Sequence, residues 1–452
     1  MLIPIPTLAF SPGKTFLVLS VILLMLILDI RGRLRHRKHH YMFAAVLGTL
    51  LSLGMIQFGT LLIARGTAGS AMVGLGVVCM VILWRLLFGA WDVPMKATVL
   101  GVFILWMGMH ILWTEPSSAR LAHVLTIIIA AIPALVWSSL FLKYHRERLG
   151  HVMLMFFAGI LSTVPILFYD ALQRHGATLQ FFLFTLQPDN FNDKVDLAVR
   201  TQLPFLGSLQ VQLASMFAGF LVIAIMEEGS KFWVLHATGK RMFRSIDDVM
   251  QLAIMAAIGF AFAENIINQG YFLGFVNEYL RSKTVDWGGF LGNVAGRSVL
   301  TIMVHIVSTG IMGYFYGLAL YAGPYLQEAR QHGKTFHVAR FIHVLSGIPL
   351  KTAFRICTFT TGMTAAILLH ATANFLVSLP ESLPGNPRTL GDLVGAAPGS
   401  PLHLIALLLI PSLLYVGGGF WLLSYLFTRK ENMKERGEMI SVETFVSRKV
   451  ME

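Results

Sequence analysis

One short motif places two carboxylates directly after an apolar run. EEGSK, residues 227–231, follows MFAGFLVIAIM, and an ionised group at the centre of a membrane helix costs about 2.5–3.5 kcal/mol on insertion scales. Glu227 and Lys231 are four residues apart and share a helix face, so we expect an ion pair between them. Glu228 points about 100° away. Its only basic neighbour at three or four residues is Lys231, which it would share with Glu227, and we expect its other partners on other helices. The structural alternative is an ion pair that snorkels to the edge of the membrane.

A second motif, GFAFAENIIN, carries Glu264 and Asn265 in the middle of its apolar run. No basic residue lies within one helical turn, so snorkelling cannot bring Glu264 to water. Its carboxyl group must be protonated, hydrogen-bonded to other helices or exposed to a water-filled cavity. A protonated structural hydrogen bond is the non-catalytic alternative.

Two further apolar runs each carry a histidine. His305 lies within GRSVLTIMVHIVSTGIMG, and His370 lies four residues before Asn374 in LLHATANFL, so the last two share a helix face. A single membrane histidine is more often a helix–helix hydrogen bond than a ligand. Small residues near His305 permit close helix packing in either case, and they are Gly310, Gly313 and Gly317.

The four motifs together indicate more than each does alone. They supply carboxylates, imidazoles and amides at membrane depth, where such groups are favourable only if they face one another or a wet cavity. A carboxylate there could take a proton from water, and an imidazole or amide could stabilise an oxyanion. Alternatively, His305, His370 and Glu228 could ligate Zn²⁺ and leave one position for water.

Composition assigns the chain to the polytopic membrane proteins. Of its 452 residues, 56% are hydrophobic and 13% are charged, and the mean hydropathy is +0.69, whereas a soluble domain has about 25% charged residues. The net charge of +12 falls mostly between apolar runs, so we expect it to set orientation in the lipid bilayer rather than to bind nucleic acid. Cys79 and Cys357 lie in apolar stretches, which excludes a disulfide framework.

The apolar runs predict an all-α helical membrane bundle. We expect about eleven transmembrane helices, at 14–30, 41–64, 69–89, 97–113, 121–143, 152–172, 208–237, 248–276, 288–322, 355–379 and 401–428. Basic residues concentrate in alternate connections, which predicts an N-out/C-in topology.

The distribution of polar groups predicts five regions. They are an N-terminal six-helix membrane region of unassigned role (1–172), an extracytoplasmic loop (173–207), a polar membrane core (208–380), a final loop and helix (381–428) and a charged cytoplasmic tail (429–452). For the loop we expect a surface amphipathic helix, with a lid over a membrane cavity as the alternative.

The motifs resemble those of the PrsW family of intramembrane proteases. EEGSK fits EExxK, and FAFAEN from Phe260 to Asn265 fits FxxxEN. His305 with the glycine-rich turn that follows it resembles the third motif, and HATAN fits HxxxN, in order and one per span. The wider superfamily includes CAAX prenyl-endopeptidases and bacteriocin-processing proteases. The resemblance covers about residues 208–380, which would form the catalytic core.

The resemblance implies a hydrolase that cuts peptide bonds inside the membrane. It assigns water activation to the pair Glu227 and Glu228, assistance in proton transfer to Glu264 and His305, and oxyanion stabilisation to His370 and Asn374. In this scheme Lys231 orients Glu227, while Phe260 and Asn265 support the site. Because no HExxH motif occurs, we favour a glutamate-activated water without a cofactor, with zinc as the alternative.

Two other functions compete with a protease. Membrane Glu and His residues also form relays in proton- or ion-coupled transporters, but the polar groups here lie in one half of the chain rather than in two matching halves. A non-catalytic scaffold of the same fold would have no need for these buried groups. We expect a membrane protein substrate, such as a single-pass regulatory protein, and a bacterial cytoplasmic membrane.

Overall fold

The computed structural model describes most of the chain. It covers residues 41–63, 91–114, 116–174, 191–203, 207–268, 271–281, 287–331 and 335–435, with shorter pieces within 16–31 and 79–89 and at 176, 179–180, 185–186, 205 and 333. The chain divides into two compact units, Met1–Glu115 and Pro116–Glu452. This boundary lies before the one at 172/173 expected from polar content, and the roles assigned to the five regions stay predictions.

The first unit contains a tightly packed helix pair. Helices α2 (Tyr41–Ile63) and α4 (Val93–Thr114) lie against each other. The indole Nε1 of Trp106 donates to Thr49 Oγ1 at 2.9 Å, and the Ser52 hydroxyl donates to the Phe103 carbonyl at 3.2 Å. These polar contacts suit a bilayer, where small and hydroxyl side chains join helices.

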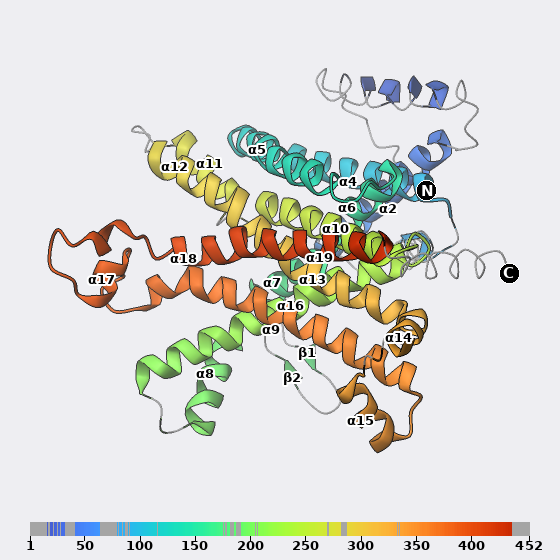
Figure 1. Cartoon of the computed structure of the whole chain (residues 1–452). Helices are drawn as coiled ribbons and strands as arrows, with labels where there is room; N and C mark the ends of the chain where they lie inside the picture. The colour runs from blue at the N-terminus through green and yellow to red at the C-terminus, as the bar shows by residue number, and fades with distance from the viewer. Residues whose placement is uncertain are drawn as a thin grey trace. The chain divides into compact units, whose positions relative to one another are not determined.

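The second unit is a bundle of long apolar helices (Figure 1). Its elements are α5 (Ser117–Phe141), α6 (Leu149–Leu161), α7 (Val164–Arg174), β1 (Leu179–Gln180), β2 (Thr185–Leu186), α8 (Phe191–Gln202), α9 (Ser208–Gly239), α10 (Ile246–Ile267), α11 (Phe272–Arg281), α12 (Trp287–Gly296), η2 (Arg297–Thr301), α13 (Ile302–Leu320), α14 (Ala322–Gln331), α15 (His337–Ser346), α16 (Leu350–Ser382), α17 (Leu390–Val394), η3 (Pro401–Leu404), α18 (Leu409–Ser412), η4 (Leu413–Gly418) and α19 (Gly419–Glu435).

The helical membrane bundle predicted from sequence is confirmed. Among the described residues, eight helices are long and apolar enough to cross a membrane, at Val93–Thr114, Ala119–Phe141, Leu149–Asp170, Ser208–Gly239, Ile246–Arg281, Trp287–Leu320, Leu350–Ser382 and Leu409–Thr428. Each matches an expected span. The 41–64 span corresponds to α2, whereas much of 14–30 and 69–89 lies outside the described residues. The N-out/C-in orientation stays a prediction.

The connection 173–207 contains regular structure where it is described. Strands β1 and β2 form a short antiparallel pair, and the amphipathic helix α8 follows. Asp196 of α8 accepts from Ser215 of α9 at 3.3 Å and pairs with Arg200 at 2.7 Å. The expected amphipathic helix is therefore present and packs against α9, while a role as a lid stays a prediction.

Of the tail 429–452, only the part up to Glu435 is described, and it continues α19.

Helix α10 is the core of the second unit. Its residues from Ile246 to Phe260 are buried on every side, and beyond Gln251 they are all apolar, as expected of a buried helix. Ser245 caps its N-terminus by accepting from the backbone N–H of Asp248 at 3.2 Å. The most extensive contacts of α10 are with α13 and α6.

Glycines allow these helices to approach α10 closely. A Cβ atom on Gly313 would lie 2.5 Å from the Cβ of Ala253, and one on Gly317 would lie 2.7 Å from a methyl carbon of Ile246. A Cβ on Gly259 of α10 would clash with the backbone carbonyl of Phe156 on α6. The small residues that the sequence shows after His305 therefore serve the α10–α13 contact.

The connection between α5 and α6 is tied to the start of α10. His145 Nε2 contacts Asp248 Oδ1 at 2.6 Å, while Glu147 accepts from His151 Nδ1 at 2.8 Å and from the Arg148 backbone at 2.7 Å. Partial burial opposes a charge on the His145 imidazole, but the hydrogen bond and charge of Asp248 outweigh burial and raise the pKa of His145 above 6.5. This ion pair fixes α10 relative to its neighbours.

The close packing at Gly313 makes a stability prediction. We expect Gly313→Ala to destabilise the full-length protein by about 1–3 kcal/mol, because the added methyl group must push α13 away from α10. The matched control is Gly292→Ala in α12, where a Cβ meets nothing within 4 Å, and it should be neutral or stabilising. Thermal unfolding in detergent measures both, and equal unfolding temperatures for the two variants would contradict the packing argument.

Candidate active site

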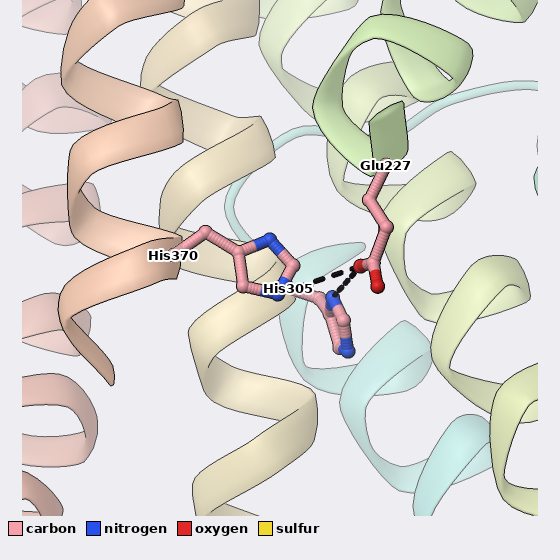
Figure 2. Close-up of side chains that lie close together, drawn as sticks. All are labelled: Glu227, His305 and His370. Atoms are coloured by element: carbon pink, nitrogen blue, oxygen red, sulfur yellow. Dashed lines mark ion pairs between the residues drawn. The ribbon is translucent and has the colours of Figure 1, made fainter. Parts of the chain in front are cut away.

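Four neighbouring helices bring the expected polar residues to one buried place. Helices α9, α10, α13 and α16 pack side by side (Figure 1). Helix α9 contributes the EEGSK residues, α10 contributes Glu264, α13 contributes His305 and α16 contributes His370. In Figure 2 the side chains of Glu227, His305 and His370 point toward one another. All three are buried, as are Glu228 and Lys231.

Lys231 supplies a cation to this cluster, and it pairs with Glu228 more closely than with Glu227. Its Nζ donates to Glu228 Oε1 at 2.8 Å and to His305 Nδ1 at 3.0 Å, and it lies 3.6 Å from Glu227 Oε2. The expected ion pair between Lys231 and Glu227 is therefore present, but it is longer than the contact between Lys231 and Glu228. Three- and four-residue spacings both bring side chains together on a helix, and the contact with His305 on α13 directs the ammonium group toward Glu228.

Glu228 has all its partners inside the cluster. Its Oε1 also accepts from His370 Nδ1 at 2.8 Å, and its Oε2 accepts from the Thr309 hydroxyl at 2.8 Å. A carboxylate oxygen only accepts, so His370 Nδ1 carries a proton, and in the neutral ring Nε2 then keeps its lone pair. Glu228 therefore orients His370 and Lys231, as carboxylates do for the histidines of metal centres.

His305 joins α10 and α13. Its Nδ1 accepts from Lys231, so the proton lies on Nε2, which donates to Glu264 Oε2 at 2.9 Å. The ring of Phe260 packs 5.3 Å from the His305 ring and carries the Lys231 ammonium at 4.1 Å from its centroid. Phe260 thus supports both neighbours by ring packing and a cation–π contact.

Glu227 presents an unsatisfied oxygen to both histidines. Its Oε2 lies 3.4 Å from His370 Nε2 and 3.9 Å from His305 Nδ1. This buried atom has no hydrogen-bond partner among the described residues. Glu227 Oε2 and His370 Nε2 therefore face each other in a buried place, with the Lys231 ammonium 3.6 Å from Oε2, and a proton or a cation between the two atoms would stabilise this arrangement.

The donor set fits a metal ion. Glu227, His305 and His370 each offer a ligand atom, and these atoms all lie within 4.8 Å of one another. Two imidazoles and one carboxylate form a known catalytic zinc set, in which bonds of about 2.0–2.2 Å place ligands about 3.3 Å apart. Glu227 stands here in place of Glu228, because both oxygens of Glu228 already accept hydrogen bonds from Lys231, His370 and Thr309. The ammonium of Lys231 competes with a metal for His305 Nδ1.

The two expected amides contribute less directly. Asn374 is half-buried one turn after His370 and makes none of the hydrogen bonds that join the described cluster. Asn265 is buried, and its Oδ1 is without a partner in the described part of the chain. The roles assigned to both residues stay predictions.

Sequence reasoning missed three residues near the cluster. Thr309 fixes Glu228, and its position four residues after His305 is the signal that could have identified it. Ser308 Oγ is buried and unpartnered among the described residues. Arg297 in the π-helical turn η2 lies over the Tyr271 ring and close enough to act electrostatically on Glu264. Such turns are frequent at functional sites.

Lys231 generates a prediction about stability. Lys231→Met should destabilise the full chain by about 3–5 kcal/mol, because it leaves buried carboxylates without their cation. We expect the double variant Lys231→Met/Glu228→Gln to recover part of that loss, since the unpaired charge is also removed. Thermal unfolding of both single variants and the double variant measures the coupling. Strictly additive losses would show that the 2.8 Å contact carries no coupling.

Comparison with known protein families supports a hydrolytic site. A protein-family model described as "PrsW family intramembrane metalloprotease" matches residues 147–394, more than half of the chain. The match includes all four motifs. No curated protein and no solved structure was found to match the chain. The description as a metalloprotease leaves the preference for a cofactor-free site unconfirmed. The chain therefore belongs to the PrsW family of intramembrane metalloproteases.

Proposed function

We propose that this intramembrane protease cuts its substrate at the cluster formed by Glu227, His305 and His370. The observation that supports this assignment is the buried Oε2 of Glu227, which faces both imidazoles and, among the described residues, has only longer ion-pair contacts and no hydrogen-bond partner. A purely structural network would be expected to satisfy that atom. We infer that the missing partner is a metal ion.

The three residues would hold the ion through Glu227 Oε2, His305 Nδ1 and His370 Nε2. A bound Zn²⁺ would lower the pKa of a water molecule and polarise the scissile carbonyl. Glu228 would keep the His370 lone pair directed at the centre through its contact with Nδ1. Lys231 would balance the negative charge of the carboxylates.

Glu264 is our candidate for the general base. Its side chain is 17% exposed, against 6% for Glu227 and 0% for Glu228, so it is the carboxylate of the cluster most accessible to a water molecule. It would take a proton from the attacking water and pass it to the leaving amine. His305 would hold the Glu264 carboxylate through its Nε2–H. We assign the developing oxyanion to the amide of Asn374.

The substrate is a membrane protein whose peptide bond reaches the bilayer interior. We propose a single-pass regulatory protein of a bacterial cytoplasmic membrane, because a single helix can enter a bundle laterally. The connection 173–207, with α8 packed on α9, is a candidate for admitting the substrate segment.

The first test is loss of cleavage. Membranes from cells that express the full chain should contain new peptide termini that disappear with Glu227→Gln, His305→Ala or Glu264→Gln, because each removes a group of the reaction centre. Glu278→Gln replaces an exposed carboxylate in α11 and should leave the termini unchanged. Quantitative mass spectrometry of membrane peptides measures the difference. Normal cleavage by all three site variants would contradict the assignment, and altered solute flux without new termini would favour a transporter.

The second test separates metal binding from proton transfer. We expect one zinc per chain in the purified protein, with zinc strongly reduced in Glu227→Gln and His370→Ala. Glu264→Gln should keep the zinc and lose cleavage, because we assign it a proton rather than the metal. Elemental analysis after dialysis measures the content. A cleaving protein without metal would restore the glutamate-activated mechanism.

A further inference from the structure

A large pocket lies on the far side of α13 from the catalytic cluster. Its volume is about 740 Å³, and α13, α14, α15, α16 and α19 line it. On α13 the lining residues Ile311, Tyr314, Phe315 and Leu318 recur at the three- and four-residue spacing of one helix face. His305 and Thr309 lie on another face of the same helix. The pocket is therefore a separate site within the second unit.

The lining is apolar and aromatic, with a polar end. Phe336 and Phe354 pack with ring centroids 4.8 Å apart, and Tyr325 stacks on Phe354 at 5.7 Å. In the connection before α15, Thr335 Oγ1 and His337 Nε2 lie 3.2 Å apart, and both residues are exposed. The volume is typical of a site for a small amphiphilic molecule.

Helix α15 forms one wall of the pocket and has two apolar faces. Its inner side, with Ala339 buried, packs in a cluster with α14 and α16. Its outer side exposes large apolar residues, namely Val338 at 68%, Phe341 at 66%, Val344 at 76% and Leu345 at 76%. An amphipathic helix with such a face lies in the interface of a bilayer, with the apolar side among the acyl chains. The pocket wall is therefore continuous with a lipid-facing surface.

The segment around α15 is basic. Residues 323–354 contain Arg330, Lys334, Arg340 and Lys351 against the single acidic residue Glu328, a net charge of +3 without the histidines. The charge pattern of the connections predicts that this segment is cytoplasmic. A basic segment at that surface attracts anionic lipid headgroups.

We propose that this pocket binds one acyl chain of an anionic phospholipid, whose headgroup contacts His337 and Arg340. The apolar aromatic lining takes the chain, and the exposed polar end at Thr335 and His337 remains at headgroup level. The outer face of α15 lies in the surrounding bilayer, so the lipid can enter sideways. Lipid bound here would pack against α13 and α16, the helices that carry the two catalytic histidines.

Cys357 provides a reporter, because it is a free thiol that lines the pocket. In a full-length Cys79→Ser background it is the only thiol. We expect dioleoyl-phosphatidylglycerol, added to delipidated protein in detergent, to slow maleimide labelling of Cys357. At a lipid concentration ten times Kd the slowing should be about tenfold. Native mass spectrometry should show one retained lipid per chain.

Two variants and two further probes test the assignment. Thr361→Trp introduces a large side chain at an exposed lining position and should abolish both the protection and the retained lipid. The matched control, Ile356→Trp, introduces the same side chain at an exposed position of the same helix that lies outside the lining, and it should retain both. Arg340→Gln should remove the preference for phosphatidylglycerol over phosphatidylcholine. Free glycerol 3-phosphate should not protect Cys357, because it lacks the acyl chain.

The proposal would be overturned by any of three results. They are full lipid retention in Thr361→Trp, labelling of Cys357 that phosphatidylglycerol does not slow, and protection by a membrane peptide but not by lipid. The last result would identify the pocket as a docking site for a protein segment. None of these readouts depends on proteolysis, so they stand apart from the test of the catalytic cluster.

Discussion

The structure of the second unit depends on one constraint, which is that buried charges must satisfy each other. Three carboxylates, two imidazoles and an ammonium group meet between α9, α10, α13 and α16. In the interior of a bilayer none of these groups can rely on bulk water. Each is therefore fixed by a partner on another helix, and the four helices must converge at one depth.

Close helix packing makes that convergence possible. Gly313 and Gly317 let α13 lie directly on α10, and Gly259 does the same for α6. The result is a rigid central helix whose far end carries Glu264, while the contact of His145 with Asp248 fixes its near end. Because so little space is left around α10, the polar cluster cannot relax by moving apart, and the unsatisfied oxygen of Glu227 remains directed at the histidines.

The sequence alone was sufficient to predict the helical bundle, the eight described spans and the six charged or imidazole-bearing residues of the cluster. Membrane spans can be predicted from the sequence because the thickness of the bilayer sets the length of the apolar run. Helical spacing, however, allows Lys231 to pair with either Glu227 or Glu228. The position of its ammonium group is set by the contact with His305, which is 74 residues away in the sequence. The proposed metal ligand could not be chosen from the sequence either. The choice of Glu227 over Glu228 depends on the hydrogen bonds that Glu228 accepts from His370 Nδ1 and Thr309, which lie on other helices. Contacts between distant helices are not encoded in local periodicity.

We propose above all that Glu227, His305 and His370 hold a catalytic metal. X-ray absorption spectroscopy at the zinc edge of the purified full-length protein tests it most directly. We expect two imidazole nitrogens and carboxylate or water oxygen at about 2.0–2.2 Å, without sulfur. A sulfur shell at about 2.3 Å, or the same spectrum after His370→Ala, would contradict it.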